Sequence, residues 1–142
     1  MTTTPKSDHK MPAAGPPILR VSYGLTLHLH QRVQSFPRAH RYSIGQALTE
    51  RSLALTTALV AANAAANPQG RLAELHTAGS ALATLRITLR LAFDLKCFSA
   101  KEQALLLTRL EDVGRQLAGW VAYTLKQQTP APETLPRGTA PA

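Results

Sequence analysis

The sequence predicts an all-α protein, an antiparallel up-down-up-down four-helix bundle. Three observations support this fold class: apolar residues recur at helical spacing in four segments, helix-start motifs precede three of them, and prolines gather near both ends of the chain. Of the 10 prolines, only Pro37 and Pro68 lie within residues 18–127. Because proline costs about 3 kcal/mol inside a helix, long helices fit only between these positions. We predict a bundle over residues 18–127, with flexible Pro-rich tails over 1–17 and 128–142.

The first two predicted helices lie on either side of Pro37. The first has an apolar stripe at three- and four-residue spacing, made of Ile18, Val21, Leu25, Leu29, Val33 and Phe36. Phe36 continues this stripe, so we expect it in the core. Ser43 and Gln46 match the S-x-x-Q capping box at the start of the second helix. The second stripe is Ile44, Leu48, Leu55, Leu59 and Ala62.

The third and fourth predicted helices have equally clear starts. Asn67 followed by Pro68 is an N-cap residue with proline at the first helical position, and Ser99 with Glu102 forms a second capping box. The third stripe is Leu72, Leu75, Leu82, Leu85, Leu89 and Ala92, and the fourth is Leu106, Leu110, Val113, Leu117 and Trp120. Short loops of about 4–8 residues make consecutive helices antiparallel neighbours.

The charge balance predicts an anionic partner. Lys and Arg number 16 against 8 Asp and Glu, which gives a formal net charge of +8. Nucleic acid, an acidic protein and a membrane surface all fit such a charge. We expect no membrane-spanning or secreted protein, because no long apolar run and no signal-peptide core are present. Together with a lone cysteine, Cys97, this favours the cytoplasm.

The residues that could carry chemistry do not form a catalytic pattern. The five histidines lack partners at the spacing that metal sharing on a helix needs. Cys97 falls at the predicted end of the third helix, where the helix dipole disfavours a thiolate, so we expect a buried apolar filler. We therefore predict no enzyme activity, no metal site and no cofactor.

The basic residues are expected to gather at one end of the bundle, because the first and third connections share an end in this topology. Two acids, Asp94 and Glu102, leave that end with a net charge of +4. Arg90 and Asp94 also have the spacing of an intrahelical ion pair, which is the alternative use of Arg90. The predicted binding residues there are Arg32, Arg38, His40, Arg41, Arg90, Lys96 and Lys101.

A second hypothesis is a protein–protein contact on the fourth helix. Gly114 and Gly119 lie in the fourth predicted helix, and Trp120 directly follows Gly119. Each glycine costs about 1 kcal/mol in a helix unless close packing uses it. These residues predict packing against another chain or helix. Trp120 also lies on the apolar seam, so the core of the protomer itself is the alternative.

Three segments resemble a known family. Residues 36–45, F-P-R-A-H-R-Y-S-I-G, resemble the F-P-K/R…R-Y/F-x-x-G segment of small bacterial four-helix proteins. Residues 85–95, L-R-I-T-L-R-L-A-F-D-L, are similar to the third helix of that group, and residues 113–121, V-G-R-Q-L-A-G-W-V, resemble its G-R-x-L-G-x-W stretch. The group includes the accessory variability determinant (Avd) of diversity-generating retroelements and the proteins encoded in ribosomal RNA intervening sequences. The Trp120 motif favours the Avd branch.

The resemblance implies a non-catalytic subunit that forms a pentameric barrel of four-helix protomers. It also implies binding to the retroelement reverse transcriptase and to RNA or DNA, in support of mutagenic cDNA synthesis. By this resemblance the arginines expected to matter are Arg38, Arg41, Arg86, Arg90 and Arg115. The alternatives are a ribosomal intervening-sequence protein, or an oligomeric interaction module without a nucleic-acid role.

Overall fold

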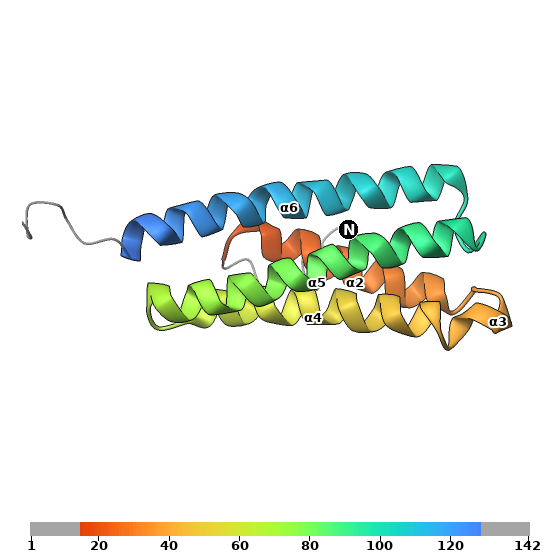
Figure 1. The fold of residues 1–142 in the computed structure, drawn as a ribbon, viewed down its shortest axis with the longest axis horizontal. Coiled ribbons are helices and arrows are strands. Elements are labelled where there is room, and N and C mark those ends of the chain that lie inside the picture. Colours follow the sequence, from red (N-terminus) through yellow and green to blue (C-terminus); the bar gives the residue numbers. More distant parts are fainter. Residues whose placement is uncertain (1–14, 129–142) are drawn as a thin grey trace, which may run out of the picture.

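A computed structural model describes residues 15–128, and these form four long helices and one short helical turn (Figure 1). The elements are α2 (Pro17–Val33), α3 (Arg38–Arg41), α4 (Ile44–Ala64), α5 (Pro68–Asp94) and α6 (Ala100–Gln128). No strand occurs within residues 15–128. The all-α fold class and the four long helices are confirmed.

The helices extend slightly beyond the predicted domain limits. α2 begins at Pro17, one residue earlier than expected, because proline is well accommodated in a first helical turn that needs no N–H donor. α6 continues to Gln128. The rest of the two predicted tails, residues 1–14 and 129–142, lies outside the described residues.

The four long helices run antiparallel to their neighbours. Figure 1 shows the α2–α4 and α5–α6 connections at one end and the α4–α5 connection at the other. α4 packs against both α2 and α5, α5 packs against α6, and the α2–α6 seam is the most loosely packed. This is the predicted up-down-up-down bundle.

The predicted apolar stripes form the core. Leu25, Leu29, Leu48 and Leu55 are fully buried, as are most members of the other stripes, and burying each leucine stabilises the fold by about 1.5–3 kcal/mol. Val21, Ile44 and Trp120 are only partly buried at its margin. Phe36 is 1% exposed, as expected.

Small polar residues bring α2 and α4 close together. The buried hydroxyl of Thr26 lies 2.7 Å from that of Thr56 and 2.9 Å from the Ser52 carbonyl oxygen. The Thr56 hydroxyl lies 3.1 Å from the carbonyl oxygen of Ser22. Because these groups satisfy one another, the seam buries polar atoms without leaving their hydrogen bonds unmade.

The predicted helix caps formed at two of the three starts. The Asn67 side chain accepts a 2.7 Å hydrogen bond from the Gly70 amide, and the Ser99 hydroxyl accepts one of 3.1 Å from the Glu102 amide. The capping box at Ser43 was wrong, because Ser43 makes no side-chain cap bond. The predicted loop before it contains α3, a helical turn that ends just ahead of α4.

Candidate functional site

Arg32 joins the two connections at one end of the bundle. Its guanidinium lies 5.8 Å from the ring centre of Phe36 and 5.4 Å from that of Phe98. Its Nε donates a 2.6 Å hydrogen bond to the Glu102 carboxylate, and Nη2 donates to the Cys97 carbonyl at 3.1 Å. We call Arg32, Phe36, Phe98 and Glu102 the Arg32 latch. Arg32 was predicted to bind a partner, and the structure instead engages its guanidinium within the protomer.

The Arg32 latch lowers the pKa of the Glu102 carboxyl. Partial burial raises the pKa of its carboxyl, but hydrogen bonds and charge from Arg32 and His28 outweigh burial and hold the pKa below its usual value. His28 Nε2 lies 3.3 Å from the same carboxylate. Burial raises the pKa of the Cys97 thiol, and the Arg32 charge offsets only part of that effect. The predicted buried, unreactive character of Cys97 is in keeping with this environment.

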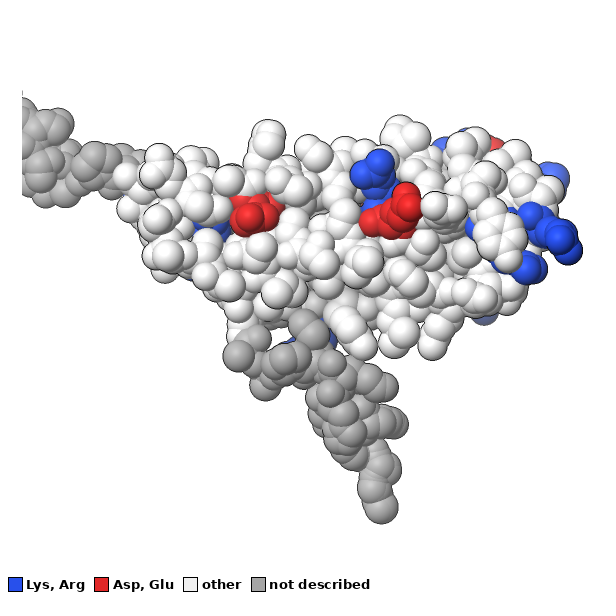
Figure 2. Space-filling model, turned by 90° about the horizontal axis from the view of Figure 1, so that it is seen from below, with Lys and Arg blue, Asp and Glu red and all other residues white. Residues whose placement is uncertain are grey.

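Exposed cations lie at the same end of the bundle as the Arg32 latch. The side chains of Arg38, Lys96 and Lys101 are exposed and form no ion pair or hydrogen bond with any described residue. Arg41 is partly buried, donates a 3.3 Å hydrogen bond to the Phe36 carbonyl and lies 6.0 Å from the Tyr42 ring centre. We call Arg38, Arg41, Lys96 and Lys101 the basic end. Figure 2, which views the molecule from the α4 side, shows Lys and Arg gathered there.

Lys96 occupies a backbone conformation that is unusual for lysine. Its φ is 67°, in the left-handed region, where it ends α5. The Lys96 amide donates to the Phe93 carbonyl and the Cys97 amide to the Ala92 carbonyl, both at 2.9 Å, which is a Schellman cap. Glycine is the usual residue at this point of the cap, so lysine retains a cation there at a cost of about 1 kcal/mol.

The other predicted arginines lie away from the basic end or are already paired. Arg90 pairs with Asp94 at 3.1 Å, which confirms the alternative reading of that spacing. Arg115 pairs with Asp112 at 2.9 Å along α6. Arg86 is exposed on α5 beside Gly114. His40 is partly exposed on α3, next to the basic end.

The predicted packing residues of α6 have different roles. A methyl group at Gly114 would lie 3.5 Å from Leu82, so this glycine faces α5. A methyl group at Gly119 would meet no other described side chain or neighbouring element within 4 Å. Trp120 packs against the core and under Arg71, whose guanidinium lies 6.0 Å from the ring centre. Trp120 therefore contributes to the packing of its own protomer.

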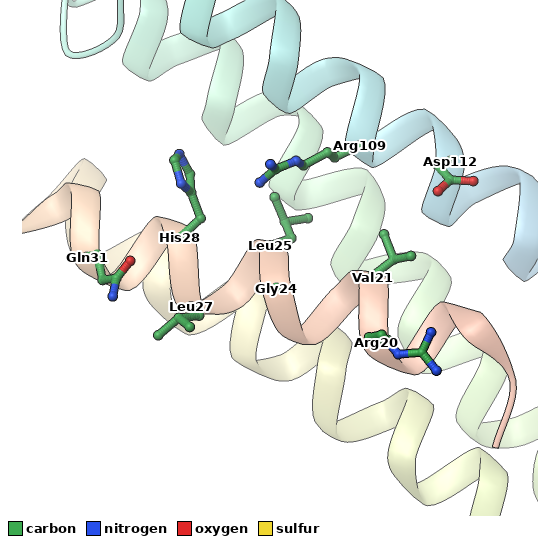
Figure 3. Close-up of a pocket in the computed structure, with 9 residues that line it drawn as sticks. All are labelled: Arg20, Val21, Gly24, Leu25, Leu27, His28, Gln31, Arg109 and Asp112. Atoms are coloured by element: carbon green, nitrogen blue, oxygen red, sulfur yellow. The ribbon is translucent and has the colours of Figure 1, made fainter. Parts of the chain in front are cut away.

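Sequence reasoning missed a groove between α2 and α6 (Figure 3). It is open to solvent with a volume of about 530 Å³, and the residues that line it include Val21, Gly24 and Leu25. Arg109 reaches from α6 toward Leu25 and His28, and Arg20 lies at the other end of the groove. Neither guanidinium has a hydrogen bond or ion pair with the part of the chain that the structure describes. A glycine in the middle of α2, where no turn needs it, was the available sequence signal.

Residues 15–128 hold no group of three or more His, Cys, Asp or Glu side chains placed to share a metal ion. No helix among them combines the length and apolar character needed to cross a membrane.

The comparison with known families agrees with the residues described above. A sequence model of the bAvd-like family matches residues 20–124, from the first turn of α2 to the last turns of α6. No curated protein matches the chain. The match covers the whole bundle, including the basic end and the Trp120 segment, and on this evidence the chain belongs to the bAvd-like family.

Proposed function

We propose that this chain is a non-catalytic accessory subunit of a diversity-generating retroelement, and that it binds the reverse transcriptase and template RNA or cDNA. Membership of the bAvd-like family supports the association with a retroelement system. The observation that supports nucleic-acid binding is the basic end, where two parts of the chain far apart in sequence present cations without acidic partners among the described residues. Arginine and lysine in such an array attract phosphate oxygens.

The proposed mechanism is electrostatic positioning. The Arg32 latch ties the two connections to each other, so Arg38 and Lys101 stay at the same end of the bundle. Cations that are already held close together bind a phosphate backbone with a smaller loss of conformational entropy. Arg86 on α5 would extend the basic surface toward the enzyme or a longer nucleic acid, whereas Arg90 and Arg115 would have to exchange Asp94 and Asp112 for such a partner. We further propose a homopentamer that acts in the cytoplasm.

Charge reversal at the basic end tests this proposal. Arg38→Glu with Lys101→Glu removes one exposed cation from each connection, and neither residue is needed for a described hydrogen bond. We expect RNA affinity to fall by about tenfold or more, and the slope of log affinity against log salt to lose about 0.7 per single-strand phosphate contact removed. The measurement is a salt titration with labelled template RNA, with co-purification of the reverse transcriptase as a second readout.

Lys126→Glu is the matched control, because Lys126 is exposed at the opposite end of α6. Each substitution changes the net charge by the same amount, so equal losses per charge in the two variants would contradict a local site. Unchanged RNA binding with lost enzyme binding would assign the basic end to the reverse transcriptase. A chain that binds ribosomal RNA and no enzyme would favour the intervening-sequence alternative.

A further inference from the structure

A small pocket lies where the end of α2, the turn α3 and the start of α4 meet. Its volume is about 290 Å³, at the lower limit of ligand pockets, so it suits one small group rather than a large ligand. Figure 1 shows α3 at the end of the bundle, between α2 and α4. The start of α4 packs closely here, because a methyl group at Gly45 would lie 2.6 Å from the Val33 side chain and 3.3 Å from the His40 carbonyl oxygen. The residues that line the pocket are His30, Val33, Gln34, Arg41, Tyr42, Gln46 and Thr49.

Tyr42 gives this pocket an exposed aromatic ring. The residue is 73% exposed, and its hydroxyl has no hydrogen bond with any residue within 15–128. The Arg41 guanidinium lies 6.0 Å from the centre of the ring. An exposed aromatic ring beside an arginine, on an irregular segment, is an arrangement on which unpaired nucleobases stack.

Arg41 is incompletely bonded within the protomer. Its Nη2 donates a 3.3 Å hydrogen bond to the Phe36 carbonyl, whereas its buried Nε has no acceptor among the described residues. No acid within residues 15–128 forms an ion pair with it. A buried donor without an acceptor costs free energy, so a ligand that brings an acceptor to this guanidinium would be favoured.

The other polar groups of the pocket include acceptors as well as donors. His30 Nδ1 lies 2.9 Å from the Thr26 carbonyl oxygen and must donate to it, which leaves Nε2 of the neutral ring as an acceptor. The Gln46 amide nitrogen donates to Glu50 at 3.0 Å, which leaves the Gln46 side-chain oxygen to accept. An apolar side chain in the pocket would leave these groups unpaired, and a phosphate alone would not use the Tyr42 ring. A nucleobase has both a flat face and a polar edge.

We propose that this pocket binds one unpaired base of a single-stranded nucleic acid, with the face of the base on the Tyr42 ring and its polar edge toward Arg41. The inference rests on nucleic-acid binding in the proposed function and names the part of the strand that contacts α3. Arg38 lies one turn before Arg41, and its side chain has no acidic partner within residues 15–128, so it can bind a phosphate next to that base. Because the bases of a duplex are already stacked, the site favours a single strand.

Two single-stranded RNA oligonucleotides of equal length test the site, one of mixed sequence and one in which every base is replaced by an abasic ribose. Both carry the same phosphates, so only the first offers a base to the pocket. We expect Tyr42→Ala to lower the affinity for the mixed-sequence strand about tenfold, as the loss of one stacked base does, and to leave the affinity for the abasic strand unchanged. Tyr42→Phe keeps the ring and should bind both strands as wild type does. Fluorescence anisotropy with the full chain measures each affinity.

Tyr123→Ala is the matched control, because Tyr123 is a 58% exposed tyrosine on α6 that does not line the pocket. It should keep the wild-type affinity for both strands, whereas Arg38→Glu should weaken both, because it removes a phosphate contact. Circular dichroism checks that each variant is helical.

Three results would overturn the base site. If Tyr42→Ala binds the mixed-sequence strand as tightly as wild type does, or loses affinity equally for both strands, the base site fails while phosphate binding at the basic end stands. If Tyr42→Ala keeps its RNA affinity but no longer co-purifies with the reverse transcriptase, the pocket belongs to a protein contact. A wild type that binds neither strand would overturn RNA binding in the proposed function, and the base site with it.

Discussion

The two ends of the bundle use an arginine in similar ways and differ in what they display. At one end Arg32 lies between two phenylalanine rings and binds Glu102. At the other, Arg71 lies against Trp120 and donates a 3.0 Å hydrogen bond to the Ala62 carbonyl. The α4–α5 connection there, Ala65-Ala66-Asn67, carries no charge, whereas the basic end has four cations that no acid within residues 15–128 neutralises.

This difference separates structural from functional charge. At each end one stacked arginine links a helix end to its neighbour. The further cations Arg38, Lys96 and Lys101 make no described contact that stabilises the bundle, and their mutual repulsion opposes folding slightly. Their concentration at one end therefore points to a partner rather than to stability.

The largest expected effect is the difference in stability between two variants, one without Arg32 and one without Arg71. Arg32→Met loses two charge-assisted hydrogen bonds and leaves Glu102 partly buried without its cation, so we expect a loss of about 2–3 kcal/mol in unfolding free energy. Arg71→Met loses one hydrogen bond to a carbonyl and a single ring contact, and about 1 kcal/mol is expected. Urea unfolding of both variants measures the contrast. Equal losses would show that the two ends are held with equal strength.

A substitution at Lys96, in the Schellman cap, is expected to change stability and RNA affinity in opposite directions. Lys96→Gly relieves the left-handed backbone and should stabilise the protein by about 1 kcal/mol, because glycine adopts φ of 67° without steric cost. The same variant removes a cation from the basic end, so RNA affinity should decrease while thermal stability increases. A variant that gains stability and keeps full RNA affinity would remove Lys96 from the proposed binding surface.

Acid titration gives the smallest expected effect. The folded pKa of Glu102 is lowered, so its carboxylate contributes stability that is present above the ordinary carboxyl pKa of 4.5 and is lost as pH falls through the folded pKa. Unfolding free energy measured from pH 6 to pH 3 should decrease more steeply in wild type than in Glu102→Gln. Parallel pH profiles for the two proteins would show that the latch does not depend on this charge.

Most of the fold could be predicted because helical periodicity is a local property. Stripes such as Leu25, Leu29 and Val33 define a buried face within a few turns, and proline positions limit where helices begin and end. The Ser43 cap failed because the preceding residues took up a helical turn of their own, which changed the backbone entering α4. Local motifs do not record such competition between neighbouring turns.

The candidate site was only partly predictable. The shared end of the two connections followed from topology, and with it the grouping of Arg38, Arg41, Lys96 and Lys101. The ion pair between Arg32 and Glu102 could not be predicted, because the two residues are 70 positions apart in the sequence. The same holds for the α2–α6 groove, since the gap around Gly24 depends on how far apart two helices at opposite ends of the sequence pack.

The sequence by itself determined the helices, their antiparallel order, the excess of positive charge and the family motifs, because each of these is set by residues close together in the chain or by simple counting. Only the tertiary structure decided which cations are displayed and which are neutralised. That choice depends on distances between residues far apart in sequence: Arg32 meets Glu102 across the bundle end, while Arg38 and Lys101 meet no acid within residues 15–128. Coulombic attraction and desolvation act over a few ångströms in space, and separation along the chain does not report those distances.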